Sequence, residues 1–177
     1  MEKSLKSVAI NYGIYLGCGL VIYTVLCYII DIEFLVNLWV NLLILPVAII
    51  TIGIVSSAKA RSLLGGFINF KQAFTAYFIP VAIGIIISTT VTVILFNFID
   101  PESAEQLKEI SINKSVSLME NMGTPQSDIN NAIETMENQE TFAVGTQLRS
   151  LAQSILFFTV IGLLVGLIMK KNDPNLA

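Results

Sequence analysis

The sequence predicts an all-α membrane protein in which four transmembrane helices carry an extramembrane two-helix hairpin between the third and the fourth helix. Three observations lead to this fold class. The chain has four long apolar runs without an interior charge, one polar segment too long to be a simple connection, and an uneven distribution of charge. Only 13% of the residues are charged, whereas a soluble domain has about 25%.

The four apolar runs cover residues 8–30, 34–58, 73–99 and 148–169 of a single membrane domain, residues 1–177. A helix needs about 20 residues to cross the hydrocarbon layer of a bilayer, and each run reaches that length. One such run could be a buried helix of a soluble protein, but four in one short chain indicate transmembrane spans. The first run is too long for a cleaved signal peptide and lacks a small-residue cleavage site, so we expect it to be retained.

The charges divide into two groups that predict the topology. Both termini and the loop between the second and third runs together hold seven Lys and Arg residues against two acids, a net charge of +5. The two other connections, together with Arg149 at the start of the last run, hold three Lys and Arg residues against eleven acids, a net charge of −8. The positive-inside rule therefore places both termini in the cytoplasm and the segment 100–145 outside.

Small residues recur at intervals of four in the first, third and last runs. This spacing places them on one face of a helix, where small side chains let two helices approach closely. Glycine is common in membrane helices in any case, but the repeated spacing favours packing faces. The residues that we expect at helix–helix contacts are Gly13, Gly17, Gly84, Gly162 and Gly166.

The loop between the second and third runs contains the most distinctive stretch, Gly65–Phe74. Its glycine pair permits a sharp reversal with positive φ, and the next asparagine and glutamine have the spacing of a capping box. The lysine between them falls in the first turn of a helix, where the dipole disfavours a cation, so we expect it to contact anionic lipid headgroups. The residues of this motif loop are Gly65, Gly66, Phe67, Asn69, Lys71 and Gln72.

Three stretches of the chain together resemble a known family. They are Gly65–Phe74, Asn97–Glu102 at the end of the third run, and Lys170–Pro174. With them the chain resembles a bacterial membrane family catalogued as domain of unknown function 4199, over nearly its whole length. The resemblance implies an integral protein of four helices in the bacterial inner membrane, with the segment 100–145 in the periplasm. It brings no activity, cofactor or catalytic residue.

The segment 100–145 is predicted to form two helices, 101–122 and 125–138, because loops beyond about 12–15 residues usually have structure of their own. Gly123 is the expected stop of the first helix, Thr124 the N-cap of the second and Pro125 its first residue. The first helix is apolar on two sides, so we expect it to be an inner layer covered on both. The side formed by Ile112, Val116 and Met119 is the candidate face for a partner protein.

The sequence excludes several kinds of chemistry. It has no histidine, which removes His-based metal sites and the most common general base. It has no phosphate-binding loop, no C-x-x-C pair and no basic patch for nucleic acid. Glu102, Glu105 and Glu109 could align toward a divalent ion, but a solvated acidic face explains them better. We expect no enzymatic activity, no cofactor and no metal.

Two functions remain. The first is a non-enzymatic protein of the cell envelope that presents the acidic hairpin and binds a partner protein or a second copy of itself. The second is an oligomeric transporter or pore subunit for a small neutral solute, lined by polar residues of the spans such as Asn41, Thr92, Asn97 and Gln153. The first predicts a dry bundle, and the second predicts that these polar residues converge on one cavity. We favour the first.

Overall fold

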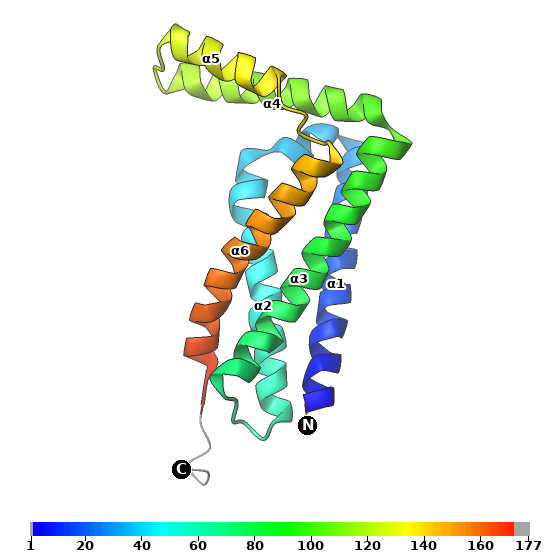
Figure 1. Cartoon of the computed structure of the whole chain (residues 1–177), viewed down its shortest axis with the longest axis vertical. Helices are drawn as coiled ribbons and strands as arrows, with labels where there is room; N and C mark the ends of the chain where they lie inside the picture. Colours follow the sequence, from blue (N-terminus) through cyan, green and yellow to red (C-terminus); the bar gives the residue numbers. More distant parts are fainter. Residues whose placement is uncertain (1, 172–177) are drawn as a thin grey trace.

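The computed structural model describes residues 2–171 and shows a bundle of four long helices with a helical hairpin across one end (Figure 1). The end of the predicted motif at residues 172–174 lies outside the described residues. In chain order the elements are α1 (Glu2–Ile30), the 3-10 helix η1 (Ile32–Val36), the π-helical η2 (Val40–Ile44), α2 (Leu45–Leu63), α3 (Phe70–Ile94), the π-helical η3 (Leu95–Ile99), α4 (Pro101–Asn121), α5 (Gln126–Glu137) and α6 (Val144–Met169).

Four of these helical stretches have the length and apolarity of transmembrane spans: Ser4–Ile30, Val40–Leu63, Phe70–Ile99 and Val144–Met169. Large apolar side chains are exposed along all four, as expected where lipid takes the place of water. The predicted fold class, an all-α membrane protein with a two-helix insertion between the third and fourth spans, is confirmed.

The boundaries of the second span differ from the prediction of 34–58. The residues after α1 form η1, which Asp31 caps by accepting from the Glu33 backbone N–H at 2.9 Å. Asn37 then accepts from the N–H groups of Trp39 and Val40, at 3.1 and 3.3 Å, and so starts the second span later. The span continues to Leu63, so the basic residues expected after its end lie within its last turns. The shift follows from the hydrogen bonds that the side chains of Asp31 and Asn37 accept, which an average of hydropathy does not describe.

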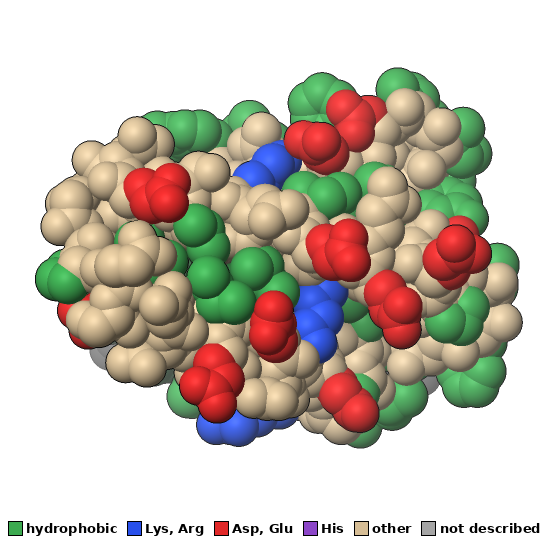
Figure 2. All heavy atoms as spheres, turned by 90° about the horizontal axis from the view of Figure 1, so that it is seen from above, with side chains coloured by type: hydrophobic (Ala, Val, Ile, Leu, Met, Phe, Trp, Pro, Cys, Tyr) green, Lys and Arg blue, Asp and Glu red, His purple; other side chains and the backbone are tan. Residues whose placement is uncertain are grey.

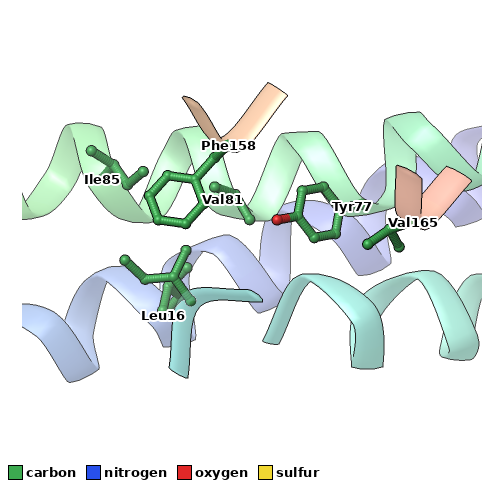
Figure 3. Close-up of a cluster of buried hydrophobic side chains, with 7 residues drawn as sticks. Leu16, Tyr77, Val81, Ile85, Phe158 and Val165 are labelled. Atoms are coloured by element: carbon green, nitrogen blue, oxygen red, sulfur yellow. The ribbon is translucent and has the colours of Figure 1, made fainter. Parts of the chain in front are cut away.

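Helix α3 is the centre of the bundle, since α1, α2 and α6 all pack against it. Its buried residues form one cluster with residues from the three other spans, part of which Figure 3 shows: Leu16, Ile49, Tyr77, Val81, Ile85, Phe158 and Val165. The glycines predicted at helix contacts lie along this centre. An added Cβ on Gly13 would come within 2.8 Å of Ile83, and one on Gly17 within 2.8 Å of Ile87.

The ring of Tyr77 lies between two glycines from different helices. An added Cβ would come within 2.6 Å of the ring at Gly53 in α2 and within 2.8 Å at Gly162 in α6. An added Cβ on Gly84 would come within 2.6 Å of Leu16, and one on Gly166 would make a looser approach of 3.1 Å to Phe70. The smallest side chain is therefore needed at each of these places because a bulky one stands opposite.

The end of the bundle away from the hairpin is closed by the loop between α2 and α3. Gly65 and Gly66 turn the chain with φ of 76° and 89°, values that side chains disfavour. Arg61 donates from Nε to the Gly66 carbonyl at 3.0 Å. Ile68, almost fully buried, then exchanges two backbone hydrogen bonds with Lys171, at 2.9 and 2.8 Å. This bridge ties the loop to the chain just beyond α6.

Candidate functional site at the hairpin end

The hairpin begins at Asp100, which joins it firmly to the first span. Asp100 caps α4 by accepting from Ser103, from the backbone N–H at 3.1 Å and from the hydroxyl at 2.6 Å. The hydroxyl of Tyr28 in α1 donates to the same carboxylate at 2.7 Å. These hydrogen bonds, from Ser103 first and then Tyr28, hold the pKa of Asp100 below its ordinary value of 3.8.

The far end of the hairpin is fixed next to its beginning. Asn97 in η3 donates from Nδ2 to the Phe142 carbonyl at 2.8 Å, and the Phe142 ring lies 5.0 Å from that of Phe96. Leu107 of α4 is fully buried in the same apolar cluster. Asn97 was predicted to line a pore, but its amide group instead anchors the chain that returns from the hairpin.

A third attachment holds the middle of α4. The Nζ atom of Lys114 lies 3.2 Å from the Glu33 carboxylate and donates to the Glu33 carbonyl at 3.3 Å. Because Glu33 belongs to η1, this pair connects the hairpin to the turn between the first two spans. The hairpin therefore has a fixed orientation on the bundle.

Helix α4 is the inner layer of the hairpin and α5 the outer one (Figure 1). Lys108 of α4 donates to the carbonyl of Glu137 at the end of α5, and Ile129 of α5 is almost completely buried. Spacing of three and four places the predicted partner face on the same side of α4 as Lys108, toward α5. Its members Ile112, Val116 and Met119 are half-buried.

The free apolar side chains of α4 lie instead on its bundle-facing side, which the sequence analysis did not single out as a site. Leu118 and Met122 are 45% and 75% exposed and continue the helical face of Leu107 and Lys114. The pattern of apolar residues shows two faces but does not show which one the second helix will cover. Two lysines show which face is covered by which neighbour: Lys108 contacts α5, and Lys114 contacts η1.

The outer surface of the hairpin is acidic. Figure 2, which looks down on this end of the molecule, shows carboxylates spread over the whole face. The exposed acids of α4, α5 and the chain after them are Glu102, Glu105, Glu109, Glu120, Asp128, Glu134, Glu137 and Glu140. The two lysines of the hairpin are engaged with Glu137 and Glu33. Within the described part of the chain, no group of three or more acids or cysteines is placed to hold a metal ion.

Beneath the hairpin lies a cavity of about 220 Å³, between α1, η1, η2 and α3. Asn41 and Thr92, two of the four residues predicted to line a pore, both contribute to its wall, together with Thr24 and Ser88. Gln153 lies instead in a lateral groove between α2 and α6 that also includes Asn41. Both π-helical segments are at this end, and such segments are frequent at functional sites.

The cavity is confined to the hairpin end. One and two turns further along α3 from Ser88 come Ile85 and Val81, then Tyr77, all buried in the packed cluster shown in Figure 3. A single copy of the bundle therefore has at one end a mainly apolar pocket with four polar residues in its wall, and a closed apolar core below it. The structure combines features of both predicted alternatives.

At the opposite end, the motif loop is mainly a structural joint. Asn69 and Gln72 form the predicted capping box at the start of α3, with hydrogen bonds of 2.9 and 3.1 Å. The Lys171 ammonium lies 5.5 Å from the ring centre of Phe67. Lys71 is exposed and lines a pocket of about 320 Å³ with Lys6, Asn69 and Gln72.

The comparisons with known proteins agree with this architecture. A family model described as "Protein of unknown function (DUF4199)" matches residues 11–171. No curated protein matches the chain, and no solved structure does. The matched region includes nearly all of the four spans, the hairpin and the Ile68–Lys171 bridge. The chain therefore belongs to this family, DUF4199, and is one of its membrane-protein members.

Proposed function

We propose that the protein is a non-enzymatic scaffold of the bacterial inner membrane that binds another envelope protein through the acidic outer face of its hairpin. Both termini lie in the cytoplasm and the hairpin in the periplasm. The charge distribution along the chain supports this orientation, since the basic residues collect at the motif loop and the termini. The resemblance of the three sequence stretches to a bacterial membrane family supports the location.

One observation carries the proposal: an anionic face is held in a fixed orientation above the membrane. The hairpin is attached at Asp100, at Phe142 and at Lys114, so its position on the spans is defined. A rigid surface loses little conformational entropy when a partner binds. A single-sign surface also attracts partners of opposite charge over a distance.

The partner is a protein with a basic surface. Two copies of the same anionic face repel each other, so the face does not favour direct self-association. The half-buried position of Ile112, Val116 and Met119 moves the binding surface from those residues to the carboxylates of α5 and the end of α4. No catalytic role is assigned, because a sequence without histidine and a site made of solvated carboxylates offer no activated nucleophile or base.

The test is crosslinking in native membranes with a neutralised face. A triple variant carries Asp128→Asn, Glu134→Gln and Glu137→Gln. It removes three negative charges and keeps side chains of the same size. A matched control, Asn131→Gln with Asn138→Gln, changes exposed residues of the same face without changing charge. We expect crosslinks to the partner to disappear in the first variant, to persist in the control, and to weaken in unmodified membranes as salt rises. Crosslinks that persist in the neutralised variant contradict the proposal.

The cavity beneath the hairpin favours a second candidate, a pore subunit for a small neutral solute. Asn41 and Thr92 come from different spans and line one cavity, as this function requires. Ser88→Leu would fill the cavity with an apolar side chain. The measurement is the rate at which proteoliposomes exchange small polyols. A rate above that of empty liposomes, and a lower rate with Ser88→Leu, would support this candidate over the scaffold. Equal exchange rates in all three would exclude it.

A further inference from the structure

The hairpin does not only cover the bundle but also reaches beyond it. Figure 1 shows α4 running across the end of the spans, with its C-terminal part and the start of α5 projecting past η2. The first half of α4 is seated on the bundle through Leu107, and Lys114 is the last residue with an ion pair to it among those described. The residues after Lys114 therefore extend beyond the part of α4 that is seated on the bundle, and face η1 and Leu38 across a groove.

The underside of this projecting part carries two exposed apolar side chains among polar ones, which include Ser115, Ser117 and Asn121. Leu107, Lys114, Leu118 and Met122 share one face of α4, and the first two contact the bundle. Leu118 and Met122 continue the same face outward, with exposures of 45% and 75%. Since the spans cross a bilayer, the surface toward which this face is directed is the adjoining leaflet.

Between this underside and η1 lies an open groove of about 550 Å³, here called the hairpin groove. Its wall includes Glu33, Leu38, Lys114, Ser117, Leu118 and Asn121. Leu38 lines the groove and stands two residues before the start of the second span. Leu38 and its neighbour Trp39 are 53% and 71% exposed, and tryptophan is enriched where a bilayer meets water.

The charges of the hairpin groove indicate the headgroup. Lys114 and Glu33 form an ion pair at 3.2 Å, and their side chains remain 40% and 57% exposed, so each charge has a side open to a further partner. A zwitterionic headgroup offers a phosphate to the first and an ammonium to the second. An anionic headgroup would meet only one of them, and the acidic hairpin above it would repel it.

We propose that a zwitterionic phospholipid of the adjoining leaflet, of the phosphatidylethanolamine type, places its headgroup in the hairpin groove while the hairpin tip rests on that leaflet through Leu118 and Met122. The acyl chains lie along Leu38 and Trp39. This site is separate from the outer acidic face and does not depend on the proposed partner or orientation.

The first experiment locates the tip. Trp39 is the only tryptophan, so Trp39→Phe with Met122→Trp leaves a single reporter under the hairpin. Trp39→Phe with Asn131→Trp places the reporter on the exposed outer side of α5 as a control. In nanodiscs of phosphatidylethanolamine brominated near the glycerol end of its chains, we expect strong quenching at position 122 and none at 131. Equal quenching at the two positions, or a crosslink from position 122 to a second copy or to another protein, overturns the proposal.

The second experiment identifies the lipid. The full chain is transferred from nanodiscs of mixed phosphatidylethanolamine and phosphatidylglycerol, and its retained lipids are counted by native mass spectrometry. We expect retained phosphatidylethanolamine, and about fivefold less with Glu33→Gln and Lys114→Gln together. Ser117→Trp fills the groove but keeps the ion pair between Lys114 and Glu33. It therefore distinguishes the loss of lipid from a loosening of the hairpin. Asn131→Trp, on the outer side of α5, is its control. Retained phosphatidylglycerol instead, or unchanged retention with Ser117→Trp, overturns the proposal.

Discussion

At the scale of single residues, Gly53 and Tyr77 define how closely the spans approach. Alanine at position 53 would place a Cβ 2.6 Å from the Tyr77 ring, so either the ring or helix α2 must move. We expect Gly53→Ala to lower the stability in detergent by about 1–3 kcal/mol through overpacking. Thermal melting of Gly53→Ala measures this loss of stability. Gly19→Ala is the control, because an added Cβ at Gly19 meets nothing within 4 Å. Equal melting temperatures for the two variants would show that α2 and α3 are less tightly packed.

The hydroxyl of Tyr77 is a second feature at this scale. It is buried without a hydrogen-bond partner among the described residues. Since an unpaired buried hydroxyl costs free energy that a hydrogen atom does not, we expect Tyr77→Phe to raise the free energy of unfolding by about 1 kcal/mol. Thermal melting in lipid nanodiscs checks this. A destabilised Tyr77→Phe protein would mean that the hydroxyl has a partner, such as bound water.

At the scale of elements, the attachment of the hairpin depends on pH. Hydrogen bonds from Ser103 and Tyr28 stabilise the charged form of Asp100 and depress its pKa below 3.8. The stability that this group contributes is therefore complete above that ordinary value and is lost as the pH falls through the pKa of the folded state.

We accordingly expect amide exchange in α4 to accelerate as the pH falls below 3.8, after correction for the intrinsic pH dependence of exchange. Asp100→Asn cannot change its charge, so its α4 should open more readily at neutral pH and show little further change on acidification. Hydrogen exchange followed by mass spectrometry makes the comparison. Parallel pH profiles for the two proteins would show that Asp100 does not hold the hairpin.

The elements that could be predicted are those that follow from a short-range rule. The capping box at Asn69 and Gln72, the stop at Gly123 and the apolar spans each depend on neighbouring residues or on summed hydropathy. The π-helical segments and η1 were not predicted, because hydropathy and helix periodicity do not distinguish a 3-10 or π turn from an α-helical one. Pro125 also stands one position earlier than expected, as the N-cap of α5.

The candidate site was harder to predict for a similar reason. Sequence spacing located two apolar faces on α4 but not the neighbour of each. Gly53 makes one of the closest approaches in the bundle and was missed, although Ser57 four residues later continues a small-residue face, because the second run has only this one glycine. Asn97 was assigned to a pore since a polar residue in a span has many possible partners, and only the fold brings Phe142 to it.

At the scale of the whole molecule, the orientation in the membrane is directly testable. Ser62 at the motif-loop end and Ser117 on the hairpin are both exposed, so a cysteine at either position is accessible to a reagent. In spheroplasts of a double Cys18→Ser and Cys27→Ser background, we expect a membrane-impermeant maleimide to label Ser117→Cys and not Ser62→Cys. Opening the cells should make position 62 reactive. The opposite pattern would mean that the hairpin is cytoplasmic.

The Ile68–Lys171 bridge has a consequence for how the protein is made. Chains emerge from the ribosome at about 5–20 residues per second, so α1 enters the bilayer seconds before α3, the helix it packs against. During that interval Gly13 and Gly17 face lipid. The backbone bridge cannot form until Lys171 has been synthesised, after all four spans. A nascent chain interrupted before Lys171 would therefore lack this bridge between the loop and the end of α6, although its first three spans could already pack together.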